Sequence, residues 1–112
     1  MKKIEVLFRP ERLEELKETL LSAGVSGTTI YQVHGCGNQH GWIQYHRGSE
    51  VMMNTLPKVY VMLVVSEEKC DAILTLIQNC LWSGEVGDGK IFISTIDDCI
   101  RIRTKEHGED AL

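Results

Sequence analysis

Four neighbouring residues between a predicted helix and a predicted strand have the types that bind phosphate: Gly87, Asp88, Gly89 and Lys90. Glycine allows backbone N–H groups to approach an anion closely, and turns of this kind form anion-binding nests. Lys90 adds a positive charge where the strand begins. Because Gly-Asp-Gly is also a common turn sequence, an ordinary turn is the alternative. The G-x-x-x-x-G-K-[ST] spacing is missing, which excludes a Walker loop.

Two arginines near the C-terminus, Arg101 and Arg103, are separated by one residue. In an extended segment, residues i and i+2 point to the same side. We therefore predict two guanidinium groups that face one way, an arrangement suited to a polyphosphate. Solvated surface arginines are the alternative, but together with the glycine turn this pair favours phosphate binding.

The composition is that of one soluble domain spanning 1–112, with 43% hydrophobic and 25% charged residues. The net charge of −4 and the lack of a basic run make a nucleic-acid partner unexpected. The charged start of the chain differs from a signal peptide, and no apolar stretch approaches the roughly 20 residues of a membrane span. We expect a cytoplasmic protein that meets a membrane only through a partner, with its four cysteines as free thiols.

Hydrophobic periodicity predicts the elements that must position these residues. Alternation and β-branched residues predict strands over 2–8, 28–34, 57–65 and 91–95. Apolar stripes predict one helix over 10–23, ended by Gly24, and a second from Ser66 to about Ser83. The order β-α-β-β-α-β predicts an α+β, ferredoxin-like fold, in which two helices cover one face of an antiparallel sheet.

A segment from Gly35 to about Asn54 has no such pattern and contains many glycines and polar residues. Loops of this length are uncommon in small domains and are usually functional. Gln39 and Lys58 flank the segment; Gln39 is a candidate metal ligand and Lys58 a candidate partner for a carboxylate. Both are also compatible with ordinary surface positions.

The sequence resembles the PII nitrogen-regulatory signal-transduction proteins over essentially its whole length. The matching stretches are Met1-Lys2-Lys3-Ile4 with Pro10, Arg47-Gly48-x-Glu50, Leu56-Pro57-Lys58-Val59, Gly87-Asp88-Gly89-Lys90-Ile91-Phe92 and Ile100-Arg101-Ile102-Arg103-Thr104. The last two are highly specific in this order and spacing.

The resemblance implies a homotrimer that binds ATP or ADP between subunits and controls partner proteins without catalysis. It implies a nucleotide-binding loop over about 82–90, with Arg101 and Arg103 supplied by the neighbouring subunit. The nucleotide-binding positions that it implies are Thr29, Gly37, Asn38, Val64, Gly87, Asp88, Gly89, Lys90, Arg101 and Arg103.

The resemblance also implies that 2-oxoglutarate and Mg²⁺ bind together with ATP. Gln39 matches the residue that contacts both the metal and 2-oxoglutarate, and Lys58 matches the lysine that meets a ligand carboxylate. The long segment, about 36–55, corresponds to the flexible T-loop of the family. That loop plugs into targets such as ammonium channels and nitrogen-metabolism enzymes.

Three positions depart from the family pattern. Val51 stands where many relatives carry a tyrosine that is nucleotidylated, so no modification is expected there. Asn38 replaces a frequent arginine near the γ-phosphate, and Met62 replaces a frequent acidic residue beside Lys90. These changes favour nucleotide binding over 2-oxoglutarate binding as the retained property.

Two other classes of function are compatible with the residues. A slow nucleotide hydrolase would use Asp88 or Glu50 as a base. However, the sequence shows no paired acid and base, and it shows no nucleophile motif. A metal-binding protein would use the histidines and cysteine at His34, Cys36, His40 and His46, although their spacing fits no standard zinc pattern.

Overall fold

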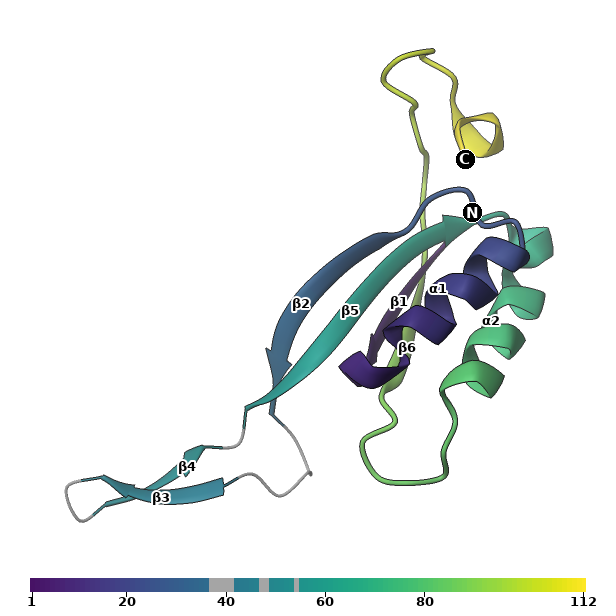
Figure 1. Cartoon of the computed structure of the whole chain (residues 1–112). Coiled ribbons are helices and arrows are strands. Elements are labelled where there is room, and N and C mark those ends of the chain that lie inside the picture. Colours follow the sequence, from purple (N-terminus) through teal and green to yellow (C-terminus); the bar gives the residue numbers. More distant parts are fainter. Residues whose placement is uncertain (37–41, 47–48, 54) are drawn as a thin grey trace.

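A computed structural model describes residues 1–36, 42–46, 49–53 and 55–112 of the chain, with the backbone alone for 42–46 and 49–53. Its main elements are the strands β1 (Lys2–Phe8), β2 (Thr29–Gly35), β5 (Leu56–Val65) and β6 (Lys90–Thr95) and the helices α1 (Leu13–Ser22) and α2 (Glu67–Leu81) (Figure 1). Short 3₁₀ turns, η1 (Pro10–Arg12) and η2 (Gly108–Ala111), precede α1 and close the chain.

The four long strands form one antiparallel sheet in the order β2-β5-β1-β6. β1 is central, since Ile4 pairs with Leu63 of β5 on one side and with Ile93 of β6 on the other. With α1 and α2 in the connections, this is the ferredoxin-like fold, and the predicted fold class is confirmed.

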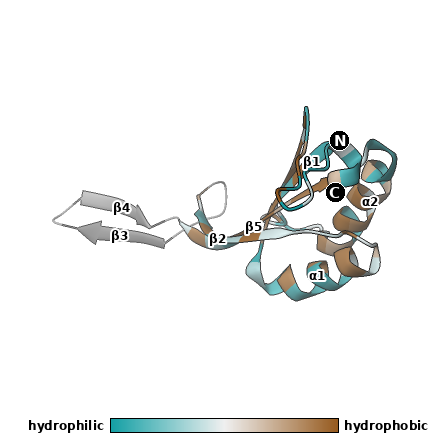
Figure 2. Cartoon of the chain, turned by 90° about the horizontal axis from the view of Figure 1, so that it is seen from above, coloured by the Kyte–Doolittle hydropathy of each residue, from teal (hydrophilic) through white to brown (hydrophobic). Residues whose placement is uncertain are grey.

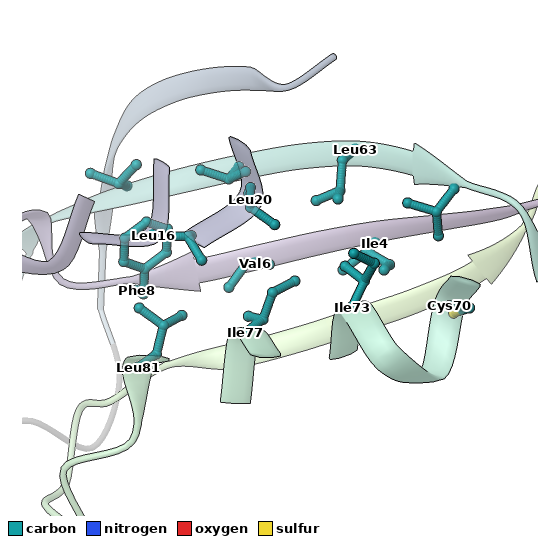
Figure 3. Packing of buried hydrophobic residues seen from close by; sticks show 13 residues of the cluster. Ile4, Val6, Phe8, Leu16, Leu20, Leu63, Cys70, Ile73, Ile77 and Leu81 are labelled. Atoms are coloured by element: carbon teal, nitrogen blue, oxygen red, sulfur yellow. The ribbon is translucent and has the colours of Figure 1, made fainter. Parts of the chain in front are cut away.

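The core lies between the sheet and the two helices (Figure 3). Every second residue of β1 and β5 faces it, as the strand period requires. Figure 2 shows that both helices carry hydrophobic and hydrophilic residues on different sides. The buried residues are Ile4, Val6, Phe8, Leu16, Leu20, Val59, Val61, Leu63, Val65, Cys70, Ile73, Ile77 and Leu81.

The helix ends follow their predicted signals with two adjustments. Pro10 opens the 3₁₀ turn η1 before α1, and Gly24 follows α1 with a positive φ of 78°. Ser66 precedes α2 as its N-cap, but its side chain accepts no capping hydrogen bond. α2 ends at Leu81, two residues before the predicted stop at Ser83.

The segment predicted as one loop contains two further strands, β3 (Trp42–His46) and β4 (Ser49–Met53). They pair antiparallel, from Trp42 with Met53 to His46 with Ser49, as a separate two-stranded sheet. Sequence analysis missed them because the short strands carry mixed polar and aromatic residues without a clear apolar face.

Among the described residues, no element covers the face of the large sheet away from the helices. Tyr31 and Tyr60 lie there in an edge-to-face contact with ring centroids 5.7 Å apart, and Phe92 is half exposed. A hydrogen bond to Glu5 and burial raise the pKa of Tyr60 to about 12. Within the described residues, no helix combines the length and the apolar character needed to cross a membrane.

Candidate functional site

The glycine loop, defined here as residues 82–90, connects α2 to β6 and contains three glycines with positive φ, of which Gly87 and Gly89 are the most positive. Gly87 and Gly89 have φ values of 99° and 113°, a region that favours glycine. A Cβ atom at Gly89 would lie 1.9 Å from the carbonyl oxygen of Leu7 in β1. The loop therefore rests directly on the central strand, and only glycine fits at this point of contact.

Asp88 holds the loop together from inside. Its carboxylate accepts hydrogen bonds from the Ser83 backbone N–H (2.7 Å), the Gly84 backbone N–H (3.1 Å) and the Ser83 hydroxyl. The bonds from Ser83, followed by that from Gly84, lower the pKa of Asp88 below its ordinary value. A carboxylate engaged in this way stabilises the turn from within. A ligand would therefore contact the backbone of Asp88 and not its side chain.

Arg9 clamps the loop from the end of β1. Its Nε donates to the Gly87 carbonyl at 3.1 Å, a second guanidinium nitrogen donates to the Val86 carbonyl, and a third lies 4.0 Å from the Glu85 carboxylate. Arg9 was not among the residues predicted for the site. The sequence shows a cation directly after the first strand, but the Gly87 carbonyl that it contacts lies 78 residues further along the chain.

Lys58 of β5 reaches the same carbonyl. Its Nζ donates to Gly87 at 3.4 Å, and burial followed by the nearby charge of Arg9 lowers its pKa. Gly35 packs against its stem, since a Cβ atom at Gly35 would lie 3.2 Å from Lys58 Cγ. The predicted carboxylate-binding lysine therefore sits where the long segment, the glycine loop and Arg9 meet.

A hollow of about 580 Å³ opens beside these two cations. Its walls come from the ends of β1 and α2, the start of β5 and the glycine loop. The lining residues are Arg9, Pro10, Glu11, Arg12, Leu56, Pro57, Lys58, Leu81, Ser83 and Asp88. Two adjacent cations with donors directed at one point can bind a carboxylate or phosphate, since charge-assisted hydrogen bonds are the strong ones.

The remaining predicted residues of the sheet lie apart from this hollow. Lys90 is exposed at the start of β6 and pairs with Leu7, whereas Thr29 is exposed on β2, at the opposite edge of the sheet. Three interstrand spacings separate the two edges, or roughly 14 Å. Val64 is half-buried on β5, opposite Lys3. One chain alone therefore does not bring the predicted nucleotide residues together.

The structure corrects the predicted geometry of Arg101 and Arg103. They lie in a turn closed by the Lys105 N–H to the Arg101 carbonyl (2.7 Å), and not in an extended segment. Arg101 is half-buried and donates to the Ala111 and Leu112 carbonyls, whereas Arg103 is exposed. The Arg-x-Arg spacing therefore does not aim both guanidinium groups the same way here.

Some predicted positions cannot be placed. Gly37, Asn38 and Gln39 lie outside the described residues, as does His40, and only the backbone of Val51 is described. His34 and Cys36 are both exposed. Across the part of the chain that the structure describes, no three His, Cys, Asp or Glu residues form a group that could hold a metal.

Comparison with known proteins addresses the origin of this arrangement. The sequence profile of the family described as nitrogen regulatory protein P-II matches residues 1–106, which include the glycine loop, Arg9, Lys58 and both arginines. The chain belongs to the P-II family. P-II proteins are nitrogen regulators by name, and the family resemblance noted from the motifs is confirmed.

Several curated P-II proteins are similar along their whole length. The nitrogen regulatory protein P-II of Rhizobium meliloti (strain 1021) is 43% identical over 112 residues, with all of both chains covered. That of Pasteurella multocida (strain Pm70) is 41% identical with the same coverage. That of Cyanidium caldarium is 43% identical over 110 residues, which cover 98% of this chain and 97% of the relative.

Proposed function

We propose that this P-II family chain is a non-catalytic sensor that binds ATP or ADP between subunits and reports the bound state to partner proteins. The conformation and charge of the glycine loop support the nucleotide-binding part of this proposal. The glycine loop presents backbone held by Gly87 and Gly89 at positive φ, and Lys90 stands exposed at its end. Nests of this kind bind the oxygens of phosphate groups.

A second ligand of the proposal is a dicarboxylate, 2-oxoglutarate, bound with Mg²⁺ and ATP. The observation that carries this part is the convergence of Arg9 and Lys58 on Gly87 at the wall of the hollow. A bound carboxylate would accept hydrogen bonds from both cations and would raise the pKa of Lys58 toward its ordinary value. The proposed Mg²⁺ ligand, Gln39, lies outside the described residues.

Assembly as a homotrimer would complete the nucleotide site. Thr29 and Lys90 stand at opposite edges of one sheet, so a ligand that touches both types of position needs a second chain. The uncovered sheet face, with Tyr31, Tyr60 and Phe92, supplies apolar surface for association. Subunit contacts of this kind commonly follow cyclic symmetry.

Signalling would use the long segment, about 36–55, as the contact with a target such as an ammonium channel or a nitrogen-metabolism enzyme. Its base is tied to Lys58 through Gly35. A ligand that moves Lys58 therefore acts on the start of the segment, and differential affinity for two segment states is all that switching requires.

Calorimetric titration tests the proposal directly. The full chain is titrated with ATP and with ADP, each with and without Mg²⁺ and 2-oxoglutarate. Binding of ATP that tightens with 2-oxoglutarate is the expected result. Absence of binding by either nucleotide would overturn the proposal.

Substitution of Arg9 and Lys58 tests whether the hollow binds 2-oxoglutarate. Lys58→Ala and Arg9→Ala should each weaken the effect of 2-oxoglutarate by about tenfold or more, since each removes a charge-assisted hydrogen bond. Lys17→Ala changes an exposed lysine on α1, which pairs with Glu14, and should leave the titration unchanged. Equal effects of all three variants would show that only overall charge matters.

Hydrolysis is the competing function, and the state of Asp88 argues against its use as a base. Its carboxylate already accepts three hydrogen bonds, and its lowered pKa makes it a weak proton acceptor. We propose that ATP persists in the complex. Repeated turnover of ATP by the purified chain, lost in Asp88→Asn, would establish the hydrolase instead.

A further inference from the structure

The C-terminal arm, defined here as residues 96–112, is a small hairpin with its own hydrogen bonds. Ile100 pairs with His107, the Arg101 N–H donates to the Glu106 carbonyl (3.0 Å), and the Gly108 N–H donates to the Cys99 carbonyl (2.9 Å). Figures 1 and 2 both show the arm folding back so that the C-terminus lies near the N-terminus.

The Arg101 side chain holds the end of this arm. One guanidinium nitrogen donates to the Leu112 carbonyl at 3.0 Å and to the Ala111 carbonyl at 3.4 Å. These acceptors belong to η2 and the residue that follows it. One of the two arginines predicted to bind phosphate is therefore engaged by its own chain.

The turn η2 also packs toward the body of the molecule. Glu109 and Leu112 line a hollow of about 370 Å³ together with Val64 and Val65 of β5 and Ile73 of α2. Val64 is one of the predicted nucleotide-binding positions. The end of the arm therefore lies beside one predicted nucleotide residue while it occupies the side chain of another.

Phosphate and η2 compete for the same donors. The Ala111 and Leu112 oxygens engage one guanidinium nitrogen of Arg101, whereas a phosphate group offers several charged oxygens and can accept from more than one. An exchange of these two acceptors for phosphate oxygens frees η2 from its contact with Arg101.

We propose that η2 is an intramolecular competitor for Arg101, so that nucleotide binding releases residues 108–112 as a second ligand-dependent signal. The proposal rests on the proposed nucleotide binding. It adds a cost to that binding, because the apparent affinity is the intrinsic affinity multiplied by the fraction of chains whose Arg101 is free. It also adds an output at the end of the molecule away from the long segment.

Calorimetry of a variant with an undocked turn tests the competition. Leu112→Asp places a charge in the hollow beside Ile73 and Val64 and should displace η2, while Arg101 stays intact. We expect ATP to bind about threefold to tenfold more tightly than in the unmodified chain. These values correspond to a fraction of chains with free Arg101 that rises to one from roughly a third or roughly a tenth, respectively. Asp110→Asn alters an exposed side chain of the same turn and should change nothing.

The tighter ATP binding expected of Leu112→Asp should depend on the presence of Arg101. In an Arg101→Ala background, Leu112→Asp should give no tightening, because the contested donor is absent. Removal of residues 109–112 provides a second route to the same state and should reproduce the tightening if Leu112→Asp disturbs folding. A matching thermal midpoint of each variant confirms that the fold is retained.

Hydrogen exchange measured by mass spectrometry gives the second readout on the full, unmodified chain. Saturating ATP should accelerate exchange in the peptide covering 105–112. If ATP binds the unmodified chain, but Leu112→Asp binds it equally and exchange at 105–112 is unchanged, the competition is overturned and the proposed nucleotide sensor stands. If no variant binds ATP, the sensor and the competition fail together. Binding by Leu112→Asp alone would support complete autoinhibition.

Discussion

The glycine loop and the C-terminal arm both carry residues that the sequence predicts to bind phosphate, but they are held in opposite ways. Hydrogen bonds from Arg9 and Lys58, two residues of the sheet region, reach the loop, and Gly89 touches the backbone of Leu7. At the base of the arm the Ile96 N–H donates to the Met1 carbonyl (3.1 Å), and the other described hydrogen bonds of the arm connect its own residues, as between Arg101 and Leu112. The loop is thus a fixed platform placed by the core, and the arm is an element whose position can change at low cost.

The contact at Gly89 gives the sharpest way to break this comparison. Gly89→Ala places a Cβ atom against the Leu7 carbonyl at a φ that side chains rarely adopt. We expect a loss of about 2–4 kcal/mol in the free energy of unfolding, measured in urea, together with loss of nucleotide binding. Gly27→Ala, with open space around the new Cβ atom, is the control. An unaffected Gly89→Ala variant would mean that the loop is not packed on β1.

Removal of the clamp should make the loop resemble the arm. Arg9→Ala deletes the hydrogen bonds to the Val86 and Gly87 carbonyls and should lower the free energy of unfolding by about 1–2 kcal/mol. Amide exchange over 83–89 should then approach the rate seen in the arm. Arg103→Ala, which removes an exposed cation, should leave exchange in the loop as it was.

Acid should loosen both regions through one aspartate each. Hydrogen bonds from Ser83 lower the pKa of Asp88, and the bond from His107 followed by that from the Cys99 N–H lowers the pKa of Asp98. A depressed folded pKa contributes stability above the ordinary value of 3.8 that is lost as the pH falls through the folded value. The amide signals of Gly84 and Gly108 should therefore shift below pH 3.8.

Substitution of each aspartate should remove one of the two acid transitions and leave the other unchanged. Asp88→Asn should abolish the transition seen at Gly84 and spare that at Gly108, and Asp98→Asn should do the reverse. One shared transition that survives in both variants would show that the whole fold, and not each turn, titrates.

The smallest effect is expected at His107. Its ring nitrogen lies 2.9 Å from the Asp98 carboxylate, but both side chains are more than half exposed, and such pairs contribute little. Asp98 keeps its bonds from the Cys99 and Gly108 N–H groups in His107→Ala. We expect faster exchange at the Gly108 amide and an unchanged thermal midpoint. A large drop in the midpoint would mean that the arm stabilises the whole fold.

The sequence contained most of the fold because strand alternation and helix stripes are local signals. The strands 2–8 and 57–65 were predicted nearly to the residue, since both bury every second side chain between sheet and helices. The strands Trp42–His46 and Ser49–Met53 were not, because they pair only with each other and need no continuous apolar face.

The candidate site was only partly predictable. Lys58 and the glycine turn were found from their types, and the structure joins them through the Gly87 carbonyl. Arg9 was missed because its role depends on a contact across the sheet that no spacing encodes. The geometry of Arg101 was wrong because a hydrogen-bonded turn overrode the extended conformation that the Ile-Arg-Ile-Arg alternation predicts.

The ladder between β2 and β5 ends at the pair Gly35 and Leu56, so both ends of the long segment are fixed side by side. The chain entropy of bringing these ends together is already offset by the sheet, and doubling the length between them would cost only about 0.6 kcal/mol. Insertions and deletions there should thus be tolerated far better than in the glycine loop. If the proposed roles hold, evolution can therefore exchange the segment that contacts a partner while the glycine loop stays unchanged.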